Sequence, residues 1–218
     1  IRLATPQPAK KAAVAKVIGE VVGTFDYQDR IGVSFPTVVI KNRAETRGNL
    51  HRSWINTQID KLLEEQTGHK YIVHNDADLA GLAEMQLGTG KGEGGLVVMV
   101  TIGTGLGTGV FYNGQLVPNI ELGRIFGKDG LPIEFFAGDK ARKVHDLTWR
   151  EWGDRFNFFL LHVKRVFSPD LFILGGGASK KFGKFRDRIT VDIPIKIAKF
   201  KNNSGIIGAA MAAADQIQ

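Results

Sequence analysis

Apolar residues recur with two different periods along this chain, and these periods predict both helices and strands. From Lys10 to Phe25 they return every three or four positions, which is typical of one buried helix face. Other apolar runs are short and bounded by turn residues, as strands are. These runs lie at 31–35, 38–40, 71–73, 96–102, 110–112, 115–117 and 171–174.

Capping residues indicate where further helices begin and end. Thr57 is a candidate N-cap for a helix that stops at Gly68. Thr148 and Glu151 have the spacing of a capping box ahead of a long periodic run. That helix is expected to end before Pro169, because the residue preceding a proline disfavours helical geometry.

Turn signals and small residues complete the pattern. Asn113-Gly114 between two apolar runs predicts a type I′ hairpin. Residues 118–145 are expected to form loop with short helical pieces. A small-residue helix beyond Gly205 is expected to pack closely on its neighbours. Because strands, hairpins and helices alternate, the pattern predicts an α/β fold.

Charge is unevenly distributed over the 218 residues. Residues 1–123 carry 12 Lys+Arg and 12 Asp+Glu, whereas residues 124–218 carry 17 and 10, so the net charge of +7 lies in the second part. This asymmetry favours a polyanionic partner such as polyphosphate, nucleic acid or an acidic protein surface. A solvated surface without a specific partner is the alternative.

The amino-acid composition excludes several kinds of site. There is no cysteine, which excludes disulfides and thiolate metal sites and fits a reducing compartment. No apolar run approaches the length needed to cross a bilayer. We therefore expect a soluble intracellular protein without membrane insertion, in the cytoplasm or an organelle such as a plastid. We assign no residue as a metal ligand.

Two polar residues follow the apolar run at 71–73. Asn75 and Asp76 lie between this strand and a helix predicted from Asp78 to Leu87. The carboxyl ends of strands are where open α/β sheets hold ligands, so Asp76 is a candidate functional carboxylate. Asp78 could instead cap the helix.

Two glycine-rich stretches follow other strands. "TIGTGLGTG" at 101–109 joins strand to strand, which excludes a dinucleotide fingerprint, and it lacks the final Gly-Lys-Ser/Thr of a P-loop. Its glycines would let backbone N–H groups approach a phosphate. "LFILGGGASKK" at 171–181 repeats this arrangement and adds two lysines. The alternative for the second stretch is a tight turn with solvated lysines.

Several segments together resemble the ROK family of sugar kinases, and within it the polyphosphate glucokinases. These segments are "GVSFP", "GNLHRSW", "NDADLAGLAEM", "TIGTGLGTGVF", "LVPNIELG", "SPDLFILGGGASKK" and "GIIGAAMAA", in family order. The resemblance implies an actin-like, ribonuclease-H-like fold with two subdomains around a cleft. Residues 1–75 would be the remainder of the amino-terminal subdomain, and 76–218 the carboxyl-terminal one with the glycine loops.

The resemblance also implies roles for individual residues. Asp76 matches the general base for the glucose 6-hydroxyl, and Asn49, Asn75 and Glu121 match groups that hold sugar hydroxyls. Phosphate-binding positions would be Gly103, Thr104, Gly105, Gly175, Gly176, Gly177, Lys180 and Lys181. The implied cofactors are Mg²⁺ and polyphosphate or ATP, and a homo-oligomer or larger assembly is compatible with the family.

The sequence also departs from the family pattern. The family's opening Asp-x-Gly-Gly-Thr phosphate loop is not found, so we expect an incomplete amino-terminal subdomain. Arg124 stands where the family has a sugar-binding His, and Thr37 where it has Gly. Two hypotheses therefore stay open: an active glucose phosphotransferase, or an inactive structural subunit of a larger assembly that binds a polyanion or nucleic acid.

Overall fold

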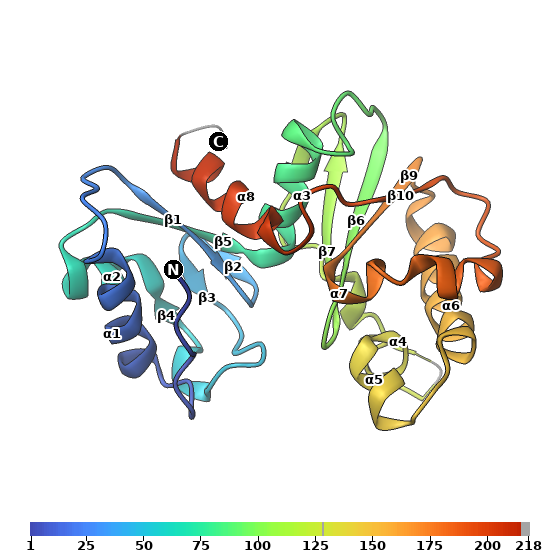
Figure 1. The fold of residues 1–218 in the computed structure, drawn as a ribbon, viewed down its shortest axis with the longest axis horizontal. Coiled ribbons are helices and arrows are strands. Elements are labelled where there is room, and N and C mark those ends of the chain that lie inside the picture. Colours follow the sequence, from blue (N-terminus) through green and yellow to red (C-terminus); the bar gives the residue numbers. More distant parts are fainter. Residues whose placement is uncertain (128, 215–218) are drawn as a thin grey trace. The chain divides into compact units, whose positions relative to one another are not determined.

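The computed structural model describes residues 1–127 and 129–214, which form two compact units (Figure 1). The first unit consists of residues 1–79 and the described residues from Gly205 onward, and the second of residues 80–204. The division falls inside helices α3 (Asp76–Leu87) and α8 (Ser204–Ala213). The sequence-based division at residue 75 had placed α8 in the second part.

Two small sheets form the first unit. Strands β1 (Ile31–Phe35) and β5 (Tyr71–Asn75) are parallel, with Ile31 opposite Tyr71 and Phe35 opposite Asn75. The second sheet is antiparallel in the order β2-β3-β4. Its strands are β2 (Val39–Ile40), β3 (Arg43–Ala44) and β4 (Thr57–Gln58). β1 has the predicted bounds, whereas β3 and β4 were not predicted.

Helices α1 (Lys11–Val22) and α2 (Ile59–Thr67) help to enclose an apolar core with these strands. At its centre the rings of Phe35 and Trp54 lie 4.8 Å apart, and the Trp54 indole N–H donates to the Ala9 carbonyl at 2.9 Å. Both rings are buried. This bond ties the segment before α1 to the core.

The start of α2 corrects one prediction. Thr57 lies in β4 and its hydroxyl donates to the Ser53 carbonyl at 2.9 Å, so it does not cap the helix. The N-cap position belongs to Gln58, which makes no side-chain capping bond. Gly68 ends the helix as predicted, with a positive φ of 78° that glycine adopts without steric cost.

Helix α8 packs on β1 and α3 through small residues. A Cβ on Gly208 would lie 1.9 Å from the Leu79 carbonyl oxygen, and one on Gly32 would lie 1.8 Å from that of Ala209. Arg30 donates from Nε and Nη2 to the Ala213 carbonyl, at 3.1 and 2.9 Å. These contacts confirm the predicted close packing and explain why α8 belongs to the first unit.

A five-stranded mixed sheet forms the second unit, in the order β10-β9-β6-β7-β8. β6 pairs in parallel with β9, and β9 with β10, whereas β6, β7 and β8 are antiparallel. The strands are β6 (Leu96–Ile102), β7 (Leu106–Tyr112), β8 (Gln115–Val117), β9 (Leu171–Gly175) and β10 (Ile195–Ile197). β7 begins at Leu106 rather than Val110, because residues 106–109 pair with β6.

The predicted turn and helix ends in this unit are confirmed. Asn113 and Gly114 both have positive φ, 49° and 79°, as a type I′ turn requires. α6 (Trp149–Phe167) begins with the complete Thr148–Glu151 capping box and ends before Ser168.

Residues 118–145 contain the expected short helical pieces, apart from residue 128, which lies outside the described residues. These pieces are the 3₁₀ helix η2 (Leu122–Arg124), α4 (Glu134–Ala137) and α5 (Asp139–Val144). Another short helix, α7 (Gly176–Ser179), follows β9.

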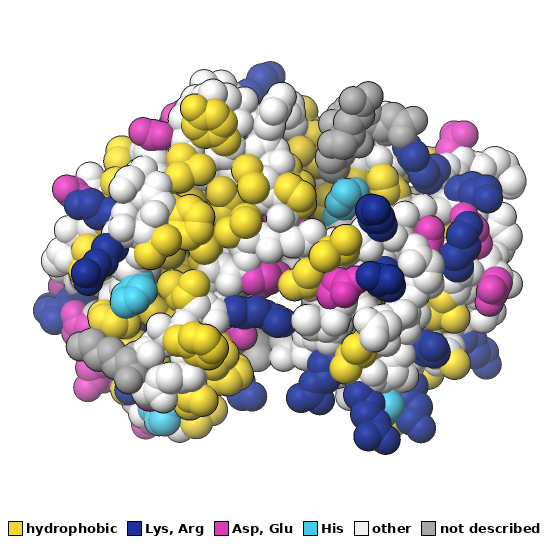
Figure 2. Space-filling view, turned by 180° about the vertical axis from the view of Figure 1, so that it is seen from behind, with side chains coloured by type: hydrophobic (Ala, Val, Ile, Leu, Met, Phe, Trp, Pro, Cys, Tyr) yellow, Lys and Arg dark blue, Asp and Glu magenta, His cyan; other side chains and the backbone are white. Residues whose placement is uncertain are grey.

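Aromatic rings dominate the core of the second unit. Trp152 stacks on Phe156 at 5.2 Å and meets Phe185 edge-on at 4.8 Å, and all three are fully buried. Other apolar side chains remain on the surface, and Figure 2 shows them gathered in a broad band on one face of this unit. Within 1–127 and 129–214 no helix is both long and apolar enough to cross a membrane.

Candidate active site

Asn75, not Asp78, caps helix α3. Its Oδ1 accepts N–H bonds from Ala77 at 2.8 Å and Asp78 at 3.1 Å, and α3 begins at Asp76. Its Nδ2 donates to the Thr37 carbonyl at 3.0 Å. An Asn at this position satisfies helix N–H groups that have no partner within the helix. Asn75 therefore fixes the backbone on which Asp76 stands.

Asp76 is the first residue of α3 and directly follows β5. Its side chain is exposed, whereas Asn75 and Ala77 on either side are buried. Desolvation by surrounding protein atoms raises the pKa of the Asp76 carboxyl above its usual value, and N–H bonds from Ala77 and from Asp76 itself oppose the rise. The Asp76 carboxyl nevertheless belongs to an exposed residue. It is thus an accessible carboxylate with increased basicity.

The loop after β1 lies against this helix start. Thr37 is buried, its hydroxyl donates to the Thr46 carbonyl at 2.8 Å, and it forms a further hydrogen bond with the Thr46 hydroxyl. Gly48 approaches the Pro36 carbonyl so closely that a Cβ would lie 2.1 Å from the oxygen. The next residue, Asn49, is exposed. The first unit thus holds Asn49, Asn75 and Asp76 on connected segments.

In the second unit, the two glycine turns lie side by side. β6 and β9 are parallel neighbours with Thr101 opposite Gly175, so the turns that follow them leave the same edge of the sheet. Gly103 and Thr104 are exposed after β6, and Gly177 is exposed after β9. A Cβ on Gly103 or Gly177 would meet nothing within 4 Å. This edge is therefore open to a ligand.

Other glycines at this edge are required by packing. Gly176 has a φ of 78°, and a Cβ there would lie 2.5 Å from the Ile102 carbonyl oxygen. A Cβ on Gly175 would lie 2.4 Å from the Met99 methyl group. The tight strand-to-helix turn considered as the alternative is thus present. A phosphate role for these two glycines stays a prediction.

Glu121 lies beside β7, and Glu134 approaches the turn between β6 and β7. Glu121 precedes η2, which is held on β7 because Leu122 N–H donates to the Thr108 hydroxyl at 2.9 Å. Glu134, at the start of α4, accepts the Leu106 N–H on Oε2 at 3.3 Å. A Cβ on Gly105 would lie 1.9 Å from the Glu134 Oε2, so the carboxylate occupies the space that a side chain there would need.

The lysines after α7 remain accessible. Lys180, Lys181, Lys184 and Arg186 are exposed, and none forms an ion pair with a carboxylate in the described part of the chain. Arg188 instead donates to both carboxylate oxygens of Asp154, at 2.7 and 3.0 Å. The run of exposed cations after α7 that lack a carboxylate partner within the described residues therefore extends from Lys180 to Arg186.

Metal binding by protein side chains alone has no support in the described residues, where no three His, Asp or Glu side chains cluster suitably. A magnesium ion carried by donor phosphates fits better, because Mg²⁺ keeps several waters and needs only one or two carboxylates. Asp76, Glu121 and Glu134 are the carboxylates at the candidate sites.

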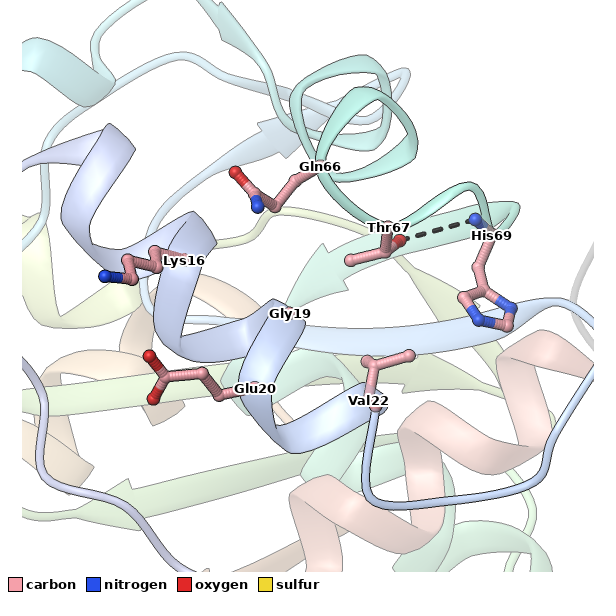
Figure 3. Close-up of a pocket in the computed structure, with 8 residues that line it drawn as sticks. Lys16, Gly19, Glu20, Val22, Gln66, Thr67 and His69 are labelled. Atoms are coloured by element: carbon pink, nitrogen blue, oxygen red, sulfur yellow. Dashed lines mark hydrogen bonds between the residues drawn. The ribbon is translucent and has the colours of Figure 1, made fainter.

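A separate groove of about 440 Å³ lies between α1 and α2 (Figure 3). Lys16 and Glu20 project from α1 on the same side, while Thr67 accepts the His69 N–H at 3.3 Å near the other end. No candidate site residue lines this groove. Its mixed charge does not indicate a particular ligand.

Comparison with known proteins identifies the family. The model of the ROK family matches residues 2–119, more than half of the chain. The chain belongs to the ROK family. It is 41% identical to a polyphosphate glucokinase of Mycobacterium tuberculosis over 213 residues, which cover 97% of this chain and 80% of that protein.

Solved structures confirm the predicted actin-like α/β fold class. An inorganic polyphosphate/ATP-glucomannokinase from Arthrobacter sp. strain KM matches with a TM-score of 0.94 and 38% identity, covering 99% of this chain and 88% of that one. A ROK family glucokinase from Streptomyces griseus matches with a TM-score of 0.82 and 20% identity, over 99% and 91% of the two chains, and shows a shared fold. Convergence of Asp76 and Glu121 stays a prediction, because they belong to different units.

Proposed function

We propose that this ROK-family chain is a glucose phosphotransferase that uses polyphosphate or ATP, with Asp76 as general base. The observation that carries the proposal is the Asp76 carboxylate, which is accessible at the carboxyl end of β5 and held there by the Asn75 cap. The 41% identity to a polyphosphate glucokinase over most of the chain supports the substrate class.

In the proposed reaction, the glucose 6-oxygen attacks the terminal phosphorus of the donor. Asp76 accepts the hydroxyl proton as the new P–O bond forms, and the bond from phosphorus to the remaining phosphate chain or ADP breaks. The raised pKa of the Asp76 carboxyl makes this group a stronger proton acceptor. Magnesium carried with the donor would neutralise phosphate charge.

The sugar and donor contacts follow from the family pattern. Asn49 and Glu121 would hold sugar hydroxyls, and the exposed Gly103, Thr104 and Gly177 would receive phosphate groups, with Lys180 and Lys181 nearby in sequence. Asn75 is buried, with its amide oxygen on helix N–H groups and its amide nitrogen on Thr37, which supports a positioning role for this residue.

The second candidate is an inactive structural subunit. Arg124 favours the inactive subunit, because its guanidinium is permanently charged where the family has His. This residue is exposed on η2, three residues after Glu121. Thr37 favours the inactive subunit less than the sequence indicated, because its hydroxyl donates to the Thr46 carbonyl within the first unit. The two candidates differ in whether the unmodified chain transfers phosphate.

The deciding experiment measures glucose 6-phosphate formation from glucose with ATP and with polyphosphate. We expect turnover by the unmodified chain and a loss of about 10²–10⁴-fold in kcat for Asp76→Asn, since general-base catalysis contributes that much. Asp29→Asn, which removes an exposed carboxylate before β1, should retain full activity.

Two results would contradict the proposal. Asp76→Asn with more than about a tenth of the original kcat would reject Asp76 as the base. No turnover by the chain with either donor, also after Arg124→His and Thr37→Gly are combined, would favour the inactive subunit. Turnover by the double variant alone would show that the unmodified chain lost its activity through changes in the sugar pocket.

A further inference from the structure

Thr37 joins three segments of the first unit, although its side chain is closed to solvent. It lies between β1 and β2 and is 3% exposed. Its N–H donates to the Phe35 carbonyl at 2.9 Å, and its hydroxyl donates to the Thr46 carbonyl at 2.8 Å. Its carbonyl accepts the Asn75 amide at 3.0 Å. Each polar group of Thr37 thus has a partner in the described part of the chain.

The hydroxyl bond extends the β2–β3 hairpin by one step. Just beyond the paired residues of the two strands, the Glu45 N–H donates to the Val38 carbonyl at 3.0 Å. At the next step the N–H of Thr37 is already bonded within its own turn, so the hydroxyl acts as the donor to Thr46 instead. Glycine, which the family has at this position, carries no hydroxyl and cannot make this bond.

Asn49 occupies the centre of a tight turn beside this bond. The Leu50 N–H donates to the Arg47 carbonyl at 2.9 Å, which closes a four-residue turn around Gly48 and Asn49. Gly48 has a φ of 53°, and a Cβ on it would lie 2.1 Å from the Pro36 carbonyl oxygen. The turn therefore lies directly against the backbone that precedes β2, and its orientation depends on that backbone.

The carbonyl of Thr37 connects the same segment to Asp76. β2 lies against β5 (Figure 1), and the Asn75 amide at the end of β5 donates to this carbonyl. Asn75 also accepts the N–H groups at the start of α3, of which Asp76 is the first residue. A shift of Thr37 would therefore change the position of Asn49 relative to Asp76.

We propose that Thr37 is a positioning residue, which sets the affinity for the sugar by fixing the spacing of Asn49 and Asp76. This role rests on the proposed function, in which Asn49 holds a sugar hydroxyl and Asp76 accepts the proton of another. Thr37 acts through these two residues, because a side chain that is 3% exposed offers no surface to the sugar. The threonine thus supports the sugar pocket and does not obstruct it.

Thr37→Val tests this role by replacing the hydroxyl with a methyl group. We expect the dissociation constant for glucose, measured by calorimetric titration, to rise about tenfold, because the buried donor to Thr46 is lost. The KM for glucose should rise by the same factor. The kcat and the KM for ATP or polyphosphate should stay within about threefold, because Asn75 still holds Asp76.

Two control variants separate positioning from general stability. Thr37→Ser keeps the hydroxyl and should bind glucose within about threefold of the unmodified chain. Thr67→Val removes a hydroxyl that donates to the Leu63 carbonyl at 2.8 Å in α2, outside the candidate site. It should lower the melting temperature without changing the dissociation constant for glucose.

A double-mutant cycle tests whether Thr37 acts through Asn49. Asn49→Ala should weaken glucose binding by itself. Adding Thr37→Val to it should weaken binding by less than about threefold more, because both changes remove the same contact with the sugar. Effects that multiply fully would show that Thr37 does not act through Asn49 and would overturn the proposal.

Three other results would also overturn it. These are a Thr37→Val protein that binds glucose as tightly as the unmodified chain, a Thr37→Gly protein that binds it more tightly, and an unmodified chain that binds no glucose. Because glucose binding is measured without a donor, it is independent of turnover. A chain that binds glucose in the expected pattern but transfers no phosphate would contradict the proposed reaction and leave the role of Thr37 intact.

Discussion

Asp76 and Glu84 both lie on helix α3, but their carboxylates differ in solvent exposure. Asp76 is exposed and free to react, and desolvation raises its pKa. Glu84 is fully buried and accepts bonds from the N–H groups of Thr89, Lys199 and Phe200, at 3.1, 2.9 and 2.8 Å, and from the Ser204 hydroxyl at 3.2 Å. Asp76 is therefore suited to accept a proton from a substrate, whereas Glu84 joins the loops that contain Thr89 and Lys199.

Asp76→Asn should stabilise the fold slightly at neutral pH. Because the folded-state pKa of Asp76 is raised, its stabilising contribution is complete below the ordinary Asp pKa and is lost as the pH rises through the folded-state value. Removing the charge should thus raise the free energy of unfolding at pH 7 by less than about 1 kcal/mol, since the group is solvent-accessible. The gain should vanish below about pH 4.

Urea unfolding of both proteins between pH 3 and pH 8 measures this difference. His74 affects both equally: burial lowers its pKa, so its contribution is present above about pH 6.5 and is lost at lower pH. A variant less stable than the parent at pH 7 would contradict the raised pKa of Asp76.

Glu84→Ala should destabilise the second unit strongly. The substitution leaves three N–H groups without their acceptor, whereas the Ser204 hydroxyl keeps the Lys201 carbonyl at 3.0 Å, and we expect a loss of about 3–5 kcal/mol. Glu84→Gln keeps one acceptor oxygen and should lose less. Chemical denaturation measures the free energy of unfolding of both variants. The control is Glu93→Ala, which breaks an exposed ion pair with Lys196 and should cost less than about 1 kcal/mol. Equal effects of Glu84→Ala and Glu93→Ala would show that the buried bonds contribute little.

At the scale of elements, close backbone approach decides how α8 packs. Gly208 lies against the Leu79 carbonyl of α3, and Gly32 of β1 against the Ala209 carbonyl of α8. The Thr148–Glu151 capping box determines the start of α6 from local sequence alone. The α3 start, in contrast, depends on Asn75 and on its bond to the Thr37 loop. Elements of the first unit are therefore fixed by contacts between segments.

Gly208→Ala tests the packing of α8. Alanine favours a helix over glycine by about 1 kcal/mol. A Cβ placed 1.9 Å from the Leu79 oxygen forces the helix away, however, so we expect a net loss of about 1–3 kcal/mol. Thermal and urea unfolding measure it. Gly183→Ala, where a Cβ meets nothing within 4 Å, should change stability by less than about 0.5 kcal/mol. A Gly208→Ala protein as stable as the parent would show that α8 can shift without cost.

At the scale of the whole molecule, positive charge is concentrated in the second unit. Residues 80–204 carry 18 Lys+Arg and 12 Asp+Glu. Many of these cations are in ion pairs, such as Arg150 with Asp187 and Lys164 with Asp192. The exposed cations at Lys180, Lys181, Lys184 and Arg186 are outside such pairs within the described residues. They form a cluster of exposed positive charge that can meet a polyanion.

Polyphosphate should therefore bind this region in a salt-dependent manner. Replacing Lys180, Lys181 and Lys184 together by Gln should weaken binding about tenfold or more at low salt, and less at physiological salt where screening is stronger. Fluorescence anisotropy with labelled polyphosphate, and separately with RNA, gives the dissociation constants. Gln at Lys10, Lys11 and Lys16 changes the net charge equally in the first unit. Equal losses for the two triple variants would mean that net charge alone governs binding.

Local patterns in the sequence predicted much of the fold. The apolar runs predicted the positions of β1, β6, β8 and β9 closely. Asn113-Gly114 predicted the β7–β8 turn, and the Thr148–Glu151 capping box predicted the start of α6. These signals succeed because each depends on only a few neighbouring residues. The ordered motifs also identified the family. The start predicted for β7 was wrong, because residues 106–109 pair with β6, and the cap predicted at Thr57 was wrong, because the Thr57 hydroxyl donates to the Ser53 carbonyl. The alternative that Asp78 caps α3 does not hold, because Asn75 takes that position.

For the candidate site, the sequence by itself determined which residue types are available, and tertiary structure decided what each one does. The Asn75-Asp76 pair is visible in the sequence, yet only the fold shows that Asn75 is the cap and Asp76 the accessible carboxylate. The two glycine stretches are 70 residues apart in the chain, and parallel pairing of β6 with β9 brings them to one sheet edge. Glu134 joins that edge through a bond to Leu106 N–H that no local pattern encodes. Hydrogen bonding and packing between distant segments are properties of the folded chain, because they depend on which surfaces meet.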